Sequence, residues 1–328
     1  MGCGDKGGPG ASPADSGAAA AGAALRIAVI PKGTTHEFWK SVHAGAVKAS
    51  RELKVEIVWK GPLKEDDLKQ QIDLVQSFTG QGVSGIVLAP LDDKALRASV
   101  QSAKNANIPV VIFDSALEGD DPASFVATDN VAAGRLAGER MVKLLSSPDK
   151  AGKGRVVVLR YQEGSASTAM REKGFLDAVK AGGLEVVSDN QYAGATTETA
   201  LATSEALLLA QGAAEGKVDG IFCPNESSTF GMLLALDKAG LSKKVKFVGF
   251  DASDKLVQAL SDKRIDALVL QDPFRMGELA VTTMVAHLRG AKVEKVIDTG
   301  ARVVDEANMK EPAIQALLKP DLSAWLGK

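Results

Sequence analysis

Cysteine, histidine and aromatic residues are scarce in this chain of 328 residues, which has two cysteines and three histidines. No apolar run reaches the roughly 20 residues that a membrane-spanning helix requires. Basic and acidic residues nearly balance at 39 and 41, which argues against a nucleic-acid or anionic-membrane surface. His36 and His43 are two helical turns apart, roughly 10 Å along the axis, too far to share a metal ion. We therefore expect no metal site and no cofactor.

Several motifs that are typical of enzymes are also missing. No glycine-rich dinucleotide fingerprint follows a strand, and no G-x-x-x-x-G-K-[ST] phosphate-binding loop occurs. No G-x-S-x-G nucleophile elbow is present. His36-Glu37 begins like a zinc-protease motif, but Lys40 occupies the place of the second histidine. The sequence therefore favours a binding protein over an enzyme.

Residues 1–24 differ in composition from the rest of the chain, with glycine, alanine, serine and proline in place of bulky apolar residues. Such a segment cannot offset the entropy cost of ordering, so we expect a flexible leader. Gly2-Cys3 followed by this tether resembles the mature start of a bacterial lipoprotein, which implies a lipid on Cys3. The second cysteine, Cys223, ends an apolar run and is expected to be a small core residue.

From residue 25 onward, short apolar runs alternate with helical patterns. Runs rich in valine and isoleucine are typical of strands buried on both faces of a parallel sheet. Repeated strand–helix alternation predicts a doubly wound α/β fold. The runs are too many for one compact sheet, so we expect two similar lobes with a break near residues 128–130. The predicted strands are 27–30, 55–58, 85–89, 109–113, 125–127, 155–159, 184–187, 220–223, 245–249 and 267–270.

The clearest strand–turn–helix unit is the stretch 26–46. Such a turn lies at the carboxyl end of a parallel sheet, where open α/β proteins bind their ligands. The turn carries His36, Phe38 and Trp39 in a chain that is poor in aromatic residues. Phe38 also fits ordinary packing, whereas Trp39 lies beside the apolar stripe of the helix, where it can face a cleft.

Three local patterns predict more ordinary roles. Thr34 and Glu37 have the spacing of a capping box at the start of a helix. The charged runs 64–67 and 171–173 have the composition of solvated surface, and we expect them to face water.

Polar residues follow four of the predicted strands. These are Asp114 with Ser115, Asn225, Asp251 and Gln271. Each one alone is typical of a turn or a helix cap. Together they occupy equivalent topological positions, so we expect them to converge on a crevice between two sheets. Carboxylate acceptors, amides and an aromatic face suit a neutral polyhydroxylated ligand.

These features resemble the type I periplasmic sugar-binding proteins, in particular the ribose-binding group, over residues 25–305. The resemblance implies two lobes joined by three crossings near residues 127, 271 and 299. It assigns 25–127 with 272–298 to an N-terminal lobe and 128–271 with 299–328 to a C-terminal lobe. The residues that carry it, in chain order, are Phe38-Trp39, 107–110 leading to Asp114, 127–130 with Gly134, 170–175, Asn225-Glu226, 248–251 and 271–273.

The resemblance also implies roles for individual residues. Phe38 and Trp39 would flank the sugar ring, and its hydroxyls and ring oxygen would be bound by Asp114, Arg171, Asn225, Asp251 and Gln271. The chain departs from a ribose binder at several positions, which predicts a different sugar, such as a deoxy, acidic or otherwise modified one. Lys32 stands where a small hydroxyl residue is usual, Ala89 replaces an asparagine and Ser115 replaces an arginine. The aromatic residue expected near Ala195 is missing, although Tyr192 lies close by. His36 and Glu37 would help to read that sugar.

The resulting prediction is a monomeric, extracytoplasmic solute-binding lipoprotein that delivers a sugar to an ABC importer. One alternative is the effector domain of a lac-repressor-like regulator, which needs a helix-turn-helix that residues 1–24 cannot supply. A second is a sugar-processing enzyme with Asp114 and Asp251 as paired carboxylates. Others are a binder that serves a chemoreceptor or sensor kinase, and a binder of a non-sugar molecule.

Overall fold

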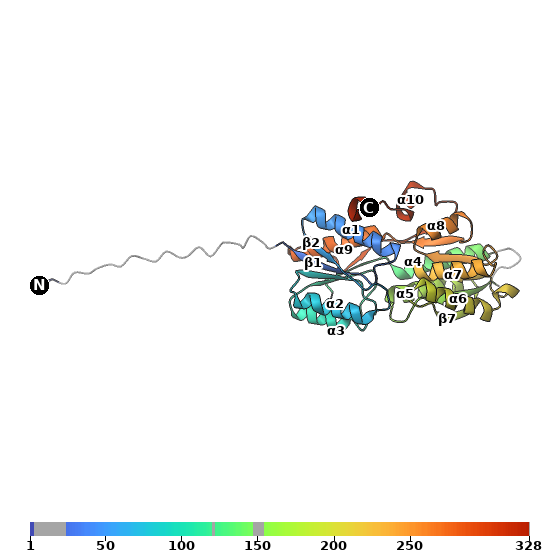
Figure 1. Cartoon of the computed structure of the whole chain (residues 1–328), viewed down its shortest axis with the longest axis horizontal. Helices are drawn as coiled ribbons and strands as arrows, with labels where there is room; N and C mark the ends of the chain where they lie inside the picture. The colour runs from blue at the N-terminus through green and yellow to red at the C-terminus, as the bar shows by residue number, and fades with distance from the viewer. Residues whose placement is uncertain (3–23, 120–121, 147–153, 328) are drawn as a thin grey trace.

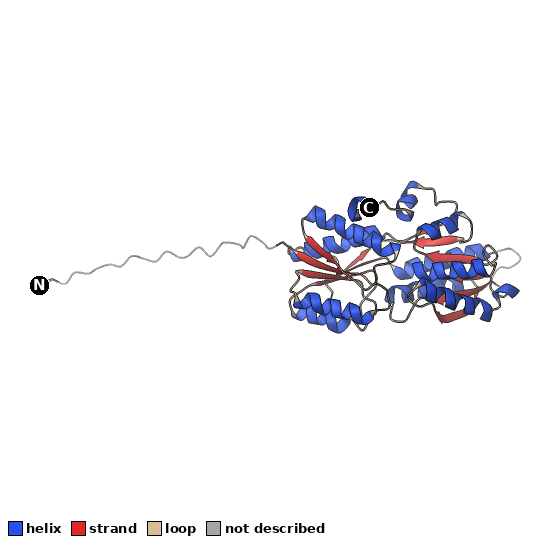
Figure 2. Ribbon diagram, viewed as in Figure 1, coloured by secondary structure: helices blue, strands red, loops and turns tan. Residues whose placement is uncertain are grey.

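The computed structural model describes residues 1–2, 24–119, 122–146 and 154–327. They form two lobes that lie side by side, each with a six-stranded sheet between layers of helices (Figures 1 and 2). We call the lobe that contains β1 the first lobe and the lobe that contains β6 the second lobe. The prediction of a two-lobed α/β fold is confirmed.

The sheet of the first lobe is entirely parallel, in the order β11-β5-β4-β3-β1-β2. Side chains alternate between its two faces, with Ile27 and Val29 on one side and Ala28 and Ile30 on the other. Its strands are β1 (Arg26–Ile30), β2 (Glu56–Trp59), β3 (Gly85–Leu88), β4 (Val110–Phe113), β5 (Ser124–Ala127) and β11 (Val296–Asp298). Helices α1 (Glu37–Leu53) and α9 (Pro273–Leu288) cover one face, and α2 (Leu68–Gly80) and α3 (Arg97–Asn105) cover the other.

The second lobe repeats this strand order as β12-β10-β9-β8-β6-β7. Its strands are β6 (Arg155–Arg160), β7 (Glu185–Tyr192), β8 (Gly220–Phe222), β9 (Lys246–Phe250), β10 (Ala267–Leu270) and β12 (Arg302–Val304). Helices α4 (Asn130–Leu145) and α5 (Ala166–Ala181) cover one face, and α6 (Thr197–Ala210), α7 (Glu226–Lys238) and α8 (Asp254–Ser261) cover the other. A 3₁₀ turn spans Ala213–Glu215.

One edge strand departs from the expected parallel arrangement, because β12 runs antiparallel to β10. A parallel strand needs a long crossover connection, usually a helix. The chain instead enters β12 from β11 of the first lobe through residues 299–301 alone, so β12 arrives in the opposite direction.

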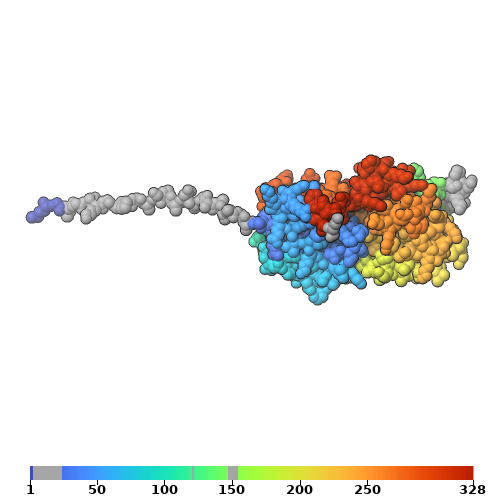
Figure 3. All heavy atoms as spheres, turned by 45° about the horizontal axis from the view of Figure 1, so that its top comes forward, coloured from blue at the N-terminus to red at the C-terminus, as the bar shows by residue number. Residues whose placement is uncertain are grey.

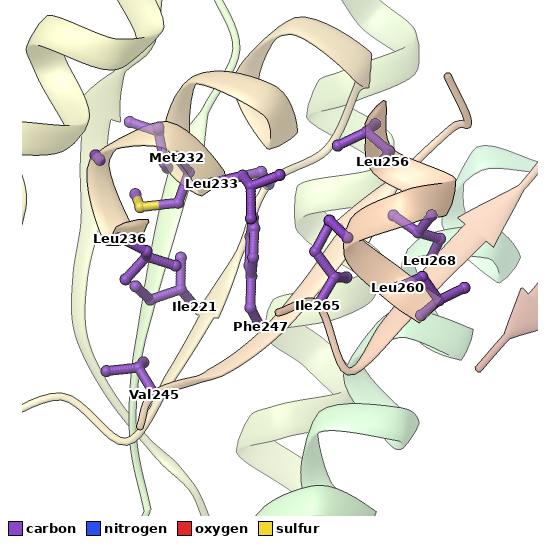
Figure 4. Close-up of a cluster of buried hydrophobic side chains, with 14 of the residues drawn as sticks. Ile221, Met232, Leu233, Leu236, Val245, Phe247, Leu256, Leu260, Ile265 and Leu268 are labelled. Carbon is purple, nitrogen blue, oxygen red and sulfur yellow. The ribbon is translucent and has the colours of Figure 1, made fainter. Parts of the chain in front are cut away.

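The core of the second lobe illustrates how these layers hold together. The Phe247 ring of β9 lies between side chains of α7, such as Leu233 and Leu236, and those of α8, such as Leu256 and Leu260 (Figure 4). All five residues are buried, and one aromatic side chain therefore joins the sheet to two helices. Cys223 belongs to the same cluster as a free, buried thiol, as predicted.

Glycines bring two helix pairs into close backbone contact, one pair in each lobe. A Cβ at Gly134 on α4 would lie 1.9 Å from the carbonyl oxygen of Arg171 on α5. A Cβ at Gly174 on α5 would lie 2.1 Å from the carbonyl oxygen of Val131 on α4. On α1 and α9, a Cβ at Gly45 would lie 1.9 Å from the Phe274 carbonyl oxygen. Only a residue without a side chain permits this approach.

The chain passes between the two sheets three times: from β5 to α4, from β10 to α9 and from β11 to β12. Asp129 and Asp272 cap the helices that begin after the first two passages, and Pro273 occupies the first turn of α9. Among the described residues, no helix is both long and apolar enough to cross a membrane.

The C-terminal segment makes a further bridge between the lobes. Helix α10 (Pro312–Leu318) packs into the core of the second lobe through Ile314 and Leu318. Helix α11 (Ser323–Leu326) then lies on α1 of the first lobe, where the Arg51 guanidinium donates to the Ala324 and Trp325 carbonyls at 2.8 and 3.0 Å. The dark red atoms in Figure 3 extend over both lobes. The end of segment 299–328, predicted for the second lobe, thus contacts the first.

Candidate functional site

The two lobes meet around a small buried cavity of about 30 Å³. A monosaccharide needs far more space than this, because small-molecule sites are typically about 300–1,000 Å³. Nine of the ten predicted ligand-binding residues line the cavity, and Ser115 lies just behind it. The described lining residues are Lys32, His36, Phe38, Trp39, Glu65, Asp114, Tyr161, Ser167, Thr168, Arg171, Asn225, Glu226, Asp251 and Gln271.

Asp114 and Asp251 occupy equivalent positions in the two lobes. Asp114 follows β4 and Asp251 follows β9, the fourth strand of each lobe in chain order. Both have left-handed backbone conformations, with φ of 61° and 65°. A positive φ is uncommon outside glycine, and aspartate adopts it more readily than most residues. The repeated fold therefore aims one carboxylate from each lobe at the same cavity.

Gln271 and Asn225 complete the set of strand-end residues. The Gln271 amide donates to Asp251 Oδ1 at 2.8 Å, while its own Oε1 is buried without a partner. Asn225 caps α7 by accepting from the Ser228 amide and donates through Nδ2 to Ser227. Asn225 therefore acts as a helix cap and also faces the cavity.

Arg171 is deeply buried, with 2% of its surface exposed, and the solvated helix face predicted for 171–173 is wrong at this position. Its Nε donates to Asn130 Oδ1 at 2.8 Å and its Nη1 to the Pro224 carbonyl at 3.0 Å. Its guanidinium lies 4.0 Å from the centre of the Phe250 ring. Nη2 is buried without a partner, so one strong donor remains available in the cavity wall. Burial lowers the pKa of Arg171, while Asp251 counteracts this shift.

Lys32 forms a buried ion pair inside the cavity wall. Its Nζ lies 3.2 Å from Asp114 Oδ2, and it also donates across the lobe boundary to Ser165 and Ser167 at 3.4 and 3.2 Å. Ser115 accepts from the Ser167 amide at 3.0 Å, also across the boundary. Lys32 and Ser115 thus lie together at a point where the lobes touch.

The N-terminus of α1 brings His36, Phe38 and Trp39 to the cavity. The Trp39 ring meets the Phe38 ring edge to face, with centroids 4.9 Å apart, so both aromatic side chains have fixed orientations. The predicted capping box is wrong, because His36 is the N-cap residue and no side chain caps the helix within the loop. Thr34 instead donates to the Pro62 carbonyl at 3.2 Å.

A carboxylate from the second lobe replaces the missing cap. Glu226 accepts from the backbone amides of Phe38 at 3.2 Å and of Glu37 at 3.4 Å. These amides carry the partial positive charge of the helix terminus, which favours a carboxylate. Burial nevertheless raises the pKa of Glu226 to about 7, against the opposing effects of His36 and the backbone hydrogen bonds.

His36 and Glu65 form the other strongly perturbed pair, with Nδ1 of the ring 2.8 Å from the carboxylate. Burial alone would lower the pKa of His36, but the attraction and hydrogen bond of Glu65 raise it to about 9. Burial would likewise raise the pKa of Glu65, but His36 and Lys32, with the Trp39 hydrogen bond, lower it to about 2. Both groups are charged at neutral pH. The same burial raises the pKa of Asp251.

Five lining residues were absent from the predicted set: Glu65, Tyr161, Ser167, Thr168 and Glu226. Tyr161 directly follows β6, so the rule that selected Asp114 would also have selected it. Glu65 is buried although run 64–67 was expected to face water, and that expectation is wrong at this residue. Tyr192 lies over the Arg160 side chain and does not line the cavity.

A larger cleft of about 740 Å³ opens beside the buried cavity and shares His36, Phe38, Glu65, Glu226, Asp251 and Gln271 with it. Its roof includes the C-terminal segment from Leu317 to Pro320, together with Leu322. The cleft therefore connects the buried polar groups with the outside of the molecule. In the described part of the chain, no group of histidine, cysteine and acidic residues has the arrangement of a metal site.

Comparison with known proteins gives relatives over most of the chain. The chain matches the family described as "Periplasmic binding protein domain" over residues 27–292. It is 31% identical over 263 residues to the ribose import binding protein RbsB of Bacillus subtilis, covering 79% of this chain and 80% of that protein. It is 29% identical over 280 residues to RbsB of Haemophilus influenzae, covering 85% and 91%.

Solved structures agree in fold. A carbohydrate transporter solute-binding protein from Agrobacterium radiobacter, in complex with D-arabinose, is 36% identical with a TM-score of 0.83, covering 90% of this chain and 99% of that one. A solute-binding protein from Agrobacterium vitis with bound D-fucose is also 36% identical with a TM-score of 0.83, covering 90% and 100%. These relatives are binding proteins of transport systems and not enzymes. By the extent of these matches, the chain belongs to the periplasmic binding protein family, in its type I sugar-binding group.

Proposed function

We propose that this protein captures a neutral monosaccharide between its lobes, outside the cytoplasm, and delivers it to an ABC importer. The main support is a pair of buried, unpartnered atoms among the cavity-lining residues: the donor Arg171 Nη2 and the acceptor Gln271 Oε1. Leaving a buried polar group unpaired costs about 1–3 kcal/mol. A sugar hydroxyl both donates and accepts, so sugar hydroxyls would satisfy both atoms.

The charges of the lining residues favour a neutral ligand over a sugar acid. Lys32 is paired with Asp114 and His36 with Glu65, and Arg171 is balanced by Asp251. A ligand carboxylate would therefore have to compete with an anion already in place. The D-arabinose and D-fucose of the two related structures are both neutral sugars, one a pentose and the other a 6-deoxyhexose. We therefore propose a pentose or a 6-deoxyhexose.

Capture requires the lobes to separate and close again. In the structure they touch directly, and the cavity of about 30 Å³ has room for one or two water molecules only. We propose that the connections after β5, β10 and β11 act as the hinge. A bound sugar would hold the lobes slightly further apart than they are here. Because it would contact both lobes, it would bind this closed form better than the open one and shift the population toward closure.

The family is consistent with a periplasmic or extracytoplasmic location. The proposed lipid attachment site, Cys3, lies outside the described residues. Mass spectrometry of the membrane fraction from a native host would test it, because a lipidated Cys3 adds the mass of its acyl chains to the N-terminal peptide. Delivery would be tested by ATP-dependent sugar uptake in proteoliposomes that contain the partner permease.

The binding test is a thermal-shift screen of pentoses, 6-deoxyhexoses, hexoses, hexuronic acids and polyols, with isothermal titration of each hit. A ligand that binds only the folded state raises the melting temperature by mass action. We expect a pentose or 6-deoxyhexose to give the largest shift and Asp251→Asn to weaken its binding at least about tenfold, through loss of a charged hydrogen-bonding partner.

Asp177→Asn is the matched control, because Asp177 pairs with Lys173 on the exposed face of α5. It should bind as the wild type does. A hexuronic acid as the best ligand would overturn the neutral-sugar proposal, and a complete absence of sugar hits would overturn the sugar assignment itself.

A further inference from the structure

Glu65 is the point of the first lobe on which three hydrogen-bond donors converge. It lies in the connection between β2 and α2, and 7% of its surface is exposed. Its Oε1 accepts from Trp39 Nε1 at 2.7 Å and is 2.8 Å from His36 Nδ1. Its Oε2 accepts from Tyr161 Oη at 2.8 Å. Both carboxylate oxygens are therefore occupied by side chains that line the cavity.

Two of these donors belong to the helix turn that faces the cavity. The hydrogen bond to Trp39 fixes the rotation of the indole, which packs edge-on against Phe38 at 4.9 Å and Phe113 at 6.1 Å. The contact with His36 occupies Nδ1, so Nε2 is the ring nitrogen left to serve as a donor in the cavity. Glu65 thus determines how both side chains are presented.

The third donor comes from the opposite lobe. Tyr161 directly follows β6 of the second lobe and is 1% exposed. The neighbouring Gln162 donates through Nε2 to the Glu65 carbonyl oxygen at 2.8 Å. Glu65 is therefore joined to the second lobe twice, through its side chain and its backbone. Separation of the lobes would break both hydrogen bonds.

The backbone around Glu65 makes room for this arrangement. A Cβ at Gly33 would lie 2.9 Å from Glu65 Cγ, so the turn after β1 passes close to the carboxylate stem. A buried carboxylate is costly unless charge partners and hydrogen bonds compensate for its lost hydration. Here the compensation comes from His36 and Trp39 at the N-terminus of α1 in the first lobe and from Tyr161 of the second, which links the charge to the closed arrangement.

We propose that Glu65 is a positioning residue of the sugar site, which orients Trp39 and His36 and holds Tyr161 of the second lobe against them when the lobes close. The ligand-binding part of this proposal rests on the proposed sugar-binding function. Tyr161 is then a closure contact, whose hydrogen bond exists only in the closed form. Replacing either residue weakens sugar binding without removing any of Asp114, Arg171, Asp251 or Gln271.

The first test needs no sugar and so remains valid even if the proposed function fails. The chain has three histidines, so carbon-labelled histidine can be followed by NMR during a pH titration. We expect His36 to titrate near pH 9 in the wild type. In Glu65→Gln the largest raising influence on the His36 pKa is lost, while Glu226 and Asp251 still raise it and burial still lowers it, so His36 should titrate at a clearly lower pH than in the wild type. Titration of His36 above pH 8 in this variant would overturn the proposal.

The second test measures sugar affinity by isothermal titration, using the sugar found in the screen. Tyr161→Phe removes one hydrogen bond to a charged group and should weaken binding about tenfold or more while leaving the His36 titration above neutrality. Tyr192→Phe is a matched control, because Tyr192 is the only other tyrosine and does not line the cavity. Equal affinities of the two variants would overturn the closure role.

A third variant tests the same role without changing Glu65, so that a folding defect in Glu65→Gln would not leave the proposal untested. Trp39→Phe keeps an aromatic ring but removes the indole donor, leaving the Glu65 charge in place. We expect weaker sugar binding with a His36 titration that stays above pH 8. Wild-type affinity in Trp39→Phe would contradict the role of Glu65 in orienting the indole.

Discussion

The Glu226 carboxylate of the second lobe accepts a hydrogen bond from the Phe38 amide of the first lobe at 3.2 Å. This contact joins the first residue of α7 to the N-terminus of α1 in the other lobe. It supplies the cap that His36 cannot provide from within α1. The two lobes therefore complete each other's local structure where they meet.

Glu226→Gln should close at least as well as the wild type at pH 8, because glutamine keeps a carbonyl acceptor without a charge. Burial raises the pKa of Glu226 to about 7, so the buried form prefers a proton. If the residue is solvated in the open form, with a pKa near 4.3, closure takes up a proton. Closure should then weaken as pH rises from about 4.5 to 7. Sugar titrations at pH 5, 6.5 and 8 should show this trend in the wild type and a flatter one in the variant.

Two controls define this prediction. Glu226→Ala loses the acceptor and should bind more weakly at every pH, whereas Glu205→Gln changes a carboxylate on the exposed face of α6 that pairs with Lys238. His36 and Asp251 are the charged groups that act on Glu226, and both are unchanged in these variants. A wild type that binds more tightly as pH rises from 5 to 7 would contradict the proposed linkage.

His36→Asn should destabilise the protein most at low and neutral pH. A histidine whose folded pKa is raised from 6.5 to about 9 contributes stability that is fully present below about pH 6.5 and is lost as pH rises through 9. Urea unfolding at pH 6, 8 and 10 should therefore give a difference in unfolding free energy that shrinks at each step. A difference that is constant across this range would mean that His36 is not charged in the fold.

Arg171→Lys should weaken sugar binding by about 10- to 100-fold, because lysine keeps the charge but loses the planar fork and its unpartnered Nη2. Isothermal titration would measure the change. Arg135→Lys, on the exposed face of α4, is the control and should bind normally. Unchanged affinity in Arg171→Lys would show that the Arg171 guanidinium does not contact the ligand.

Gly134→Ala should destabilise the second lobe by about 1–3 kcal/mol or more, because its Cβ would meet the Arg171 carbonyl oxygen at 1.9 Å and force α4 and α5 apart. Since α5 carries Arg171, sugar affinity should fall as well. Gly80→Ala at the end of α2 has no neighbour within 4 Å and should stabilise by about 0.5–1 kcal/mol. Chemical denaturation would measure the free energy of unfolding of both variants. Equal changes in that free energy would contradict the conclusion that close packing of α4 and α5 requires glycine at position 134.

The architecture and most of the site could be predicted from the sequence, because both follow from local patterns. Valine- and isoleucine-rich runs mark buried strands wherever they occur, and the end of a parallel strand is a defined place in space. Asp114, Asn225, Asp251 and Gln271 follow such strands and all line the cavity. Tyr161 occupies the equivalent position after β6 and also lines the cavity, although it is not among the predicted residues.

Other features depend on tertiary contacts that no local pattern records. Glu65 and Arg171 lie in charged runs whose composition is that of a solvated surface, yet the packing of a loop against the other lobe buries one, and the close approach of α4 and α5 buries the other. The cap of α1 comes from Glu226, 188 residues from Phe38. Only the assembled fold places these groups together.

Because α11 lies on α1, the last described helix and the residues 24–25 that lead into β1 are both on the first lobe. The second lobe then consists of two stretches of chain, 130–270 and 302–318, each of which begins and ends at the first lobe. If the protein is held at its N-terminus, the second lobe is the part that is free to swing. Fluorophores placed at the start of β1 and on α11 would move with the same lobe and report no opening. A reporter of the motion has to be attached to an internal turn of the second lobe, such as the one at Gly216.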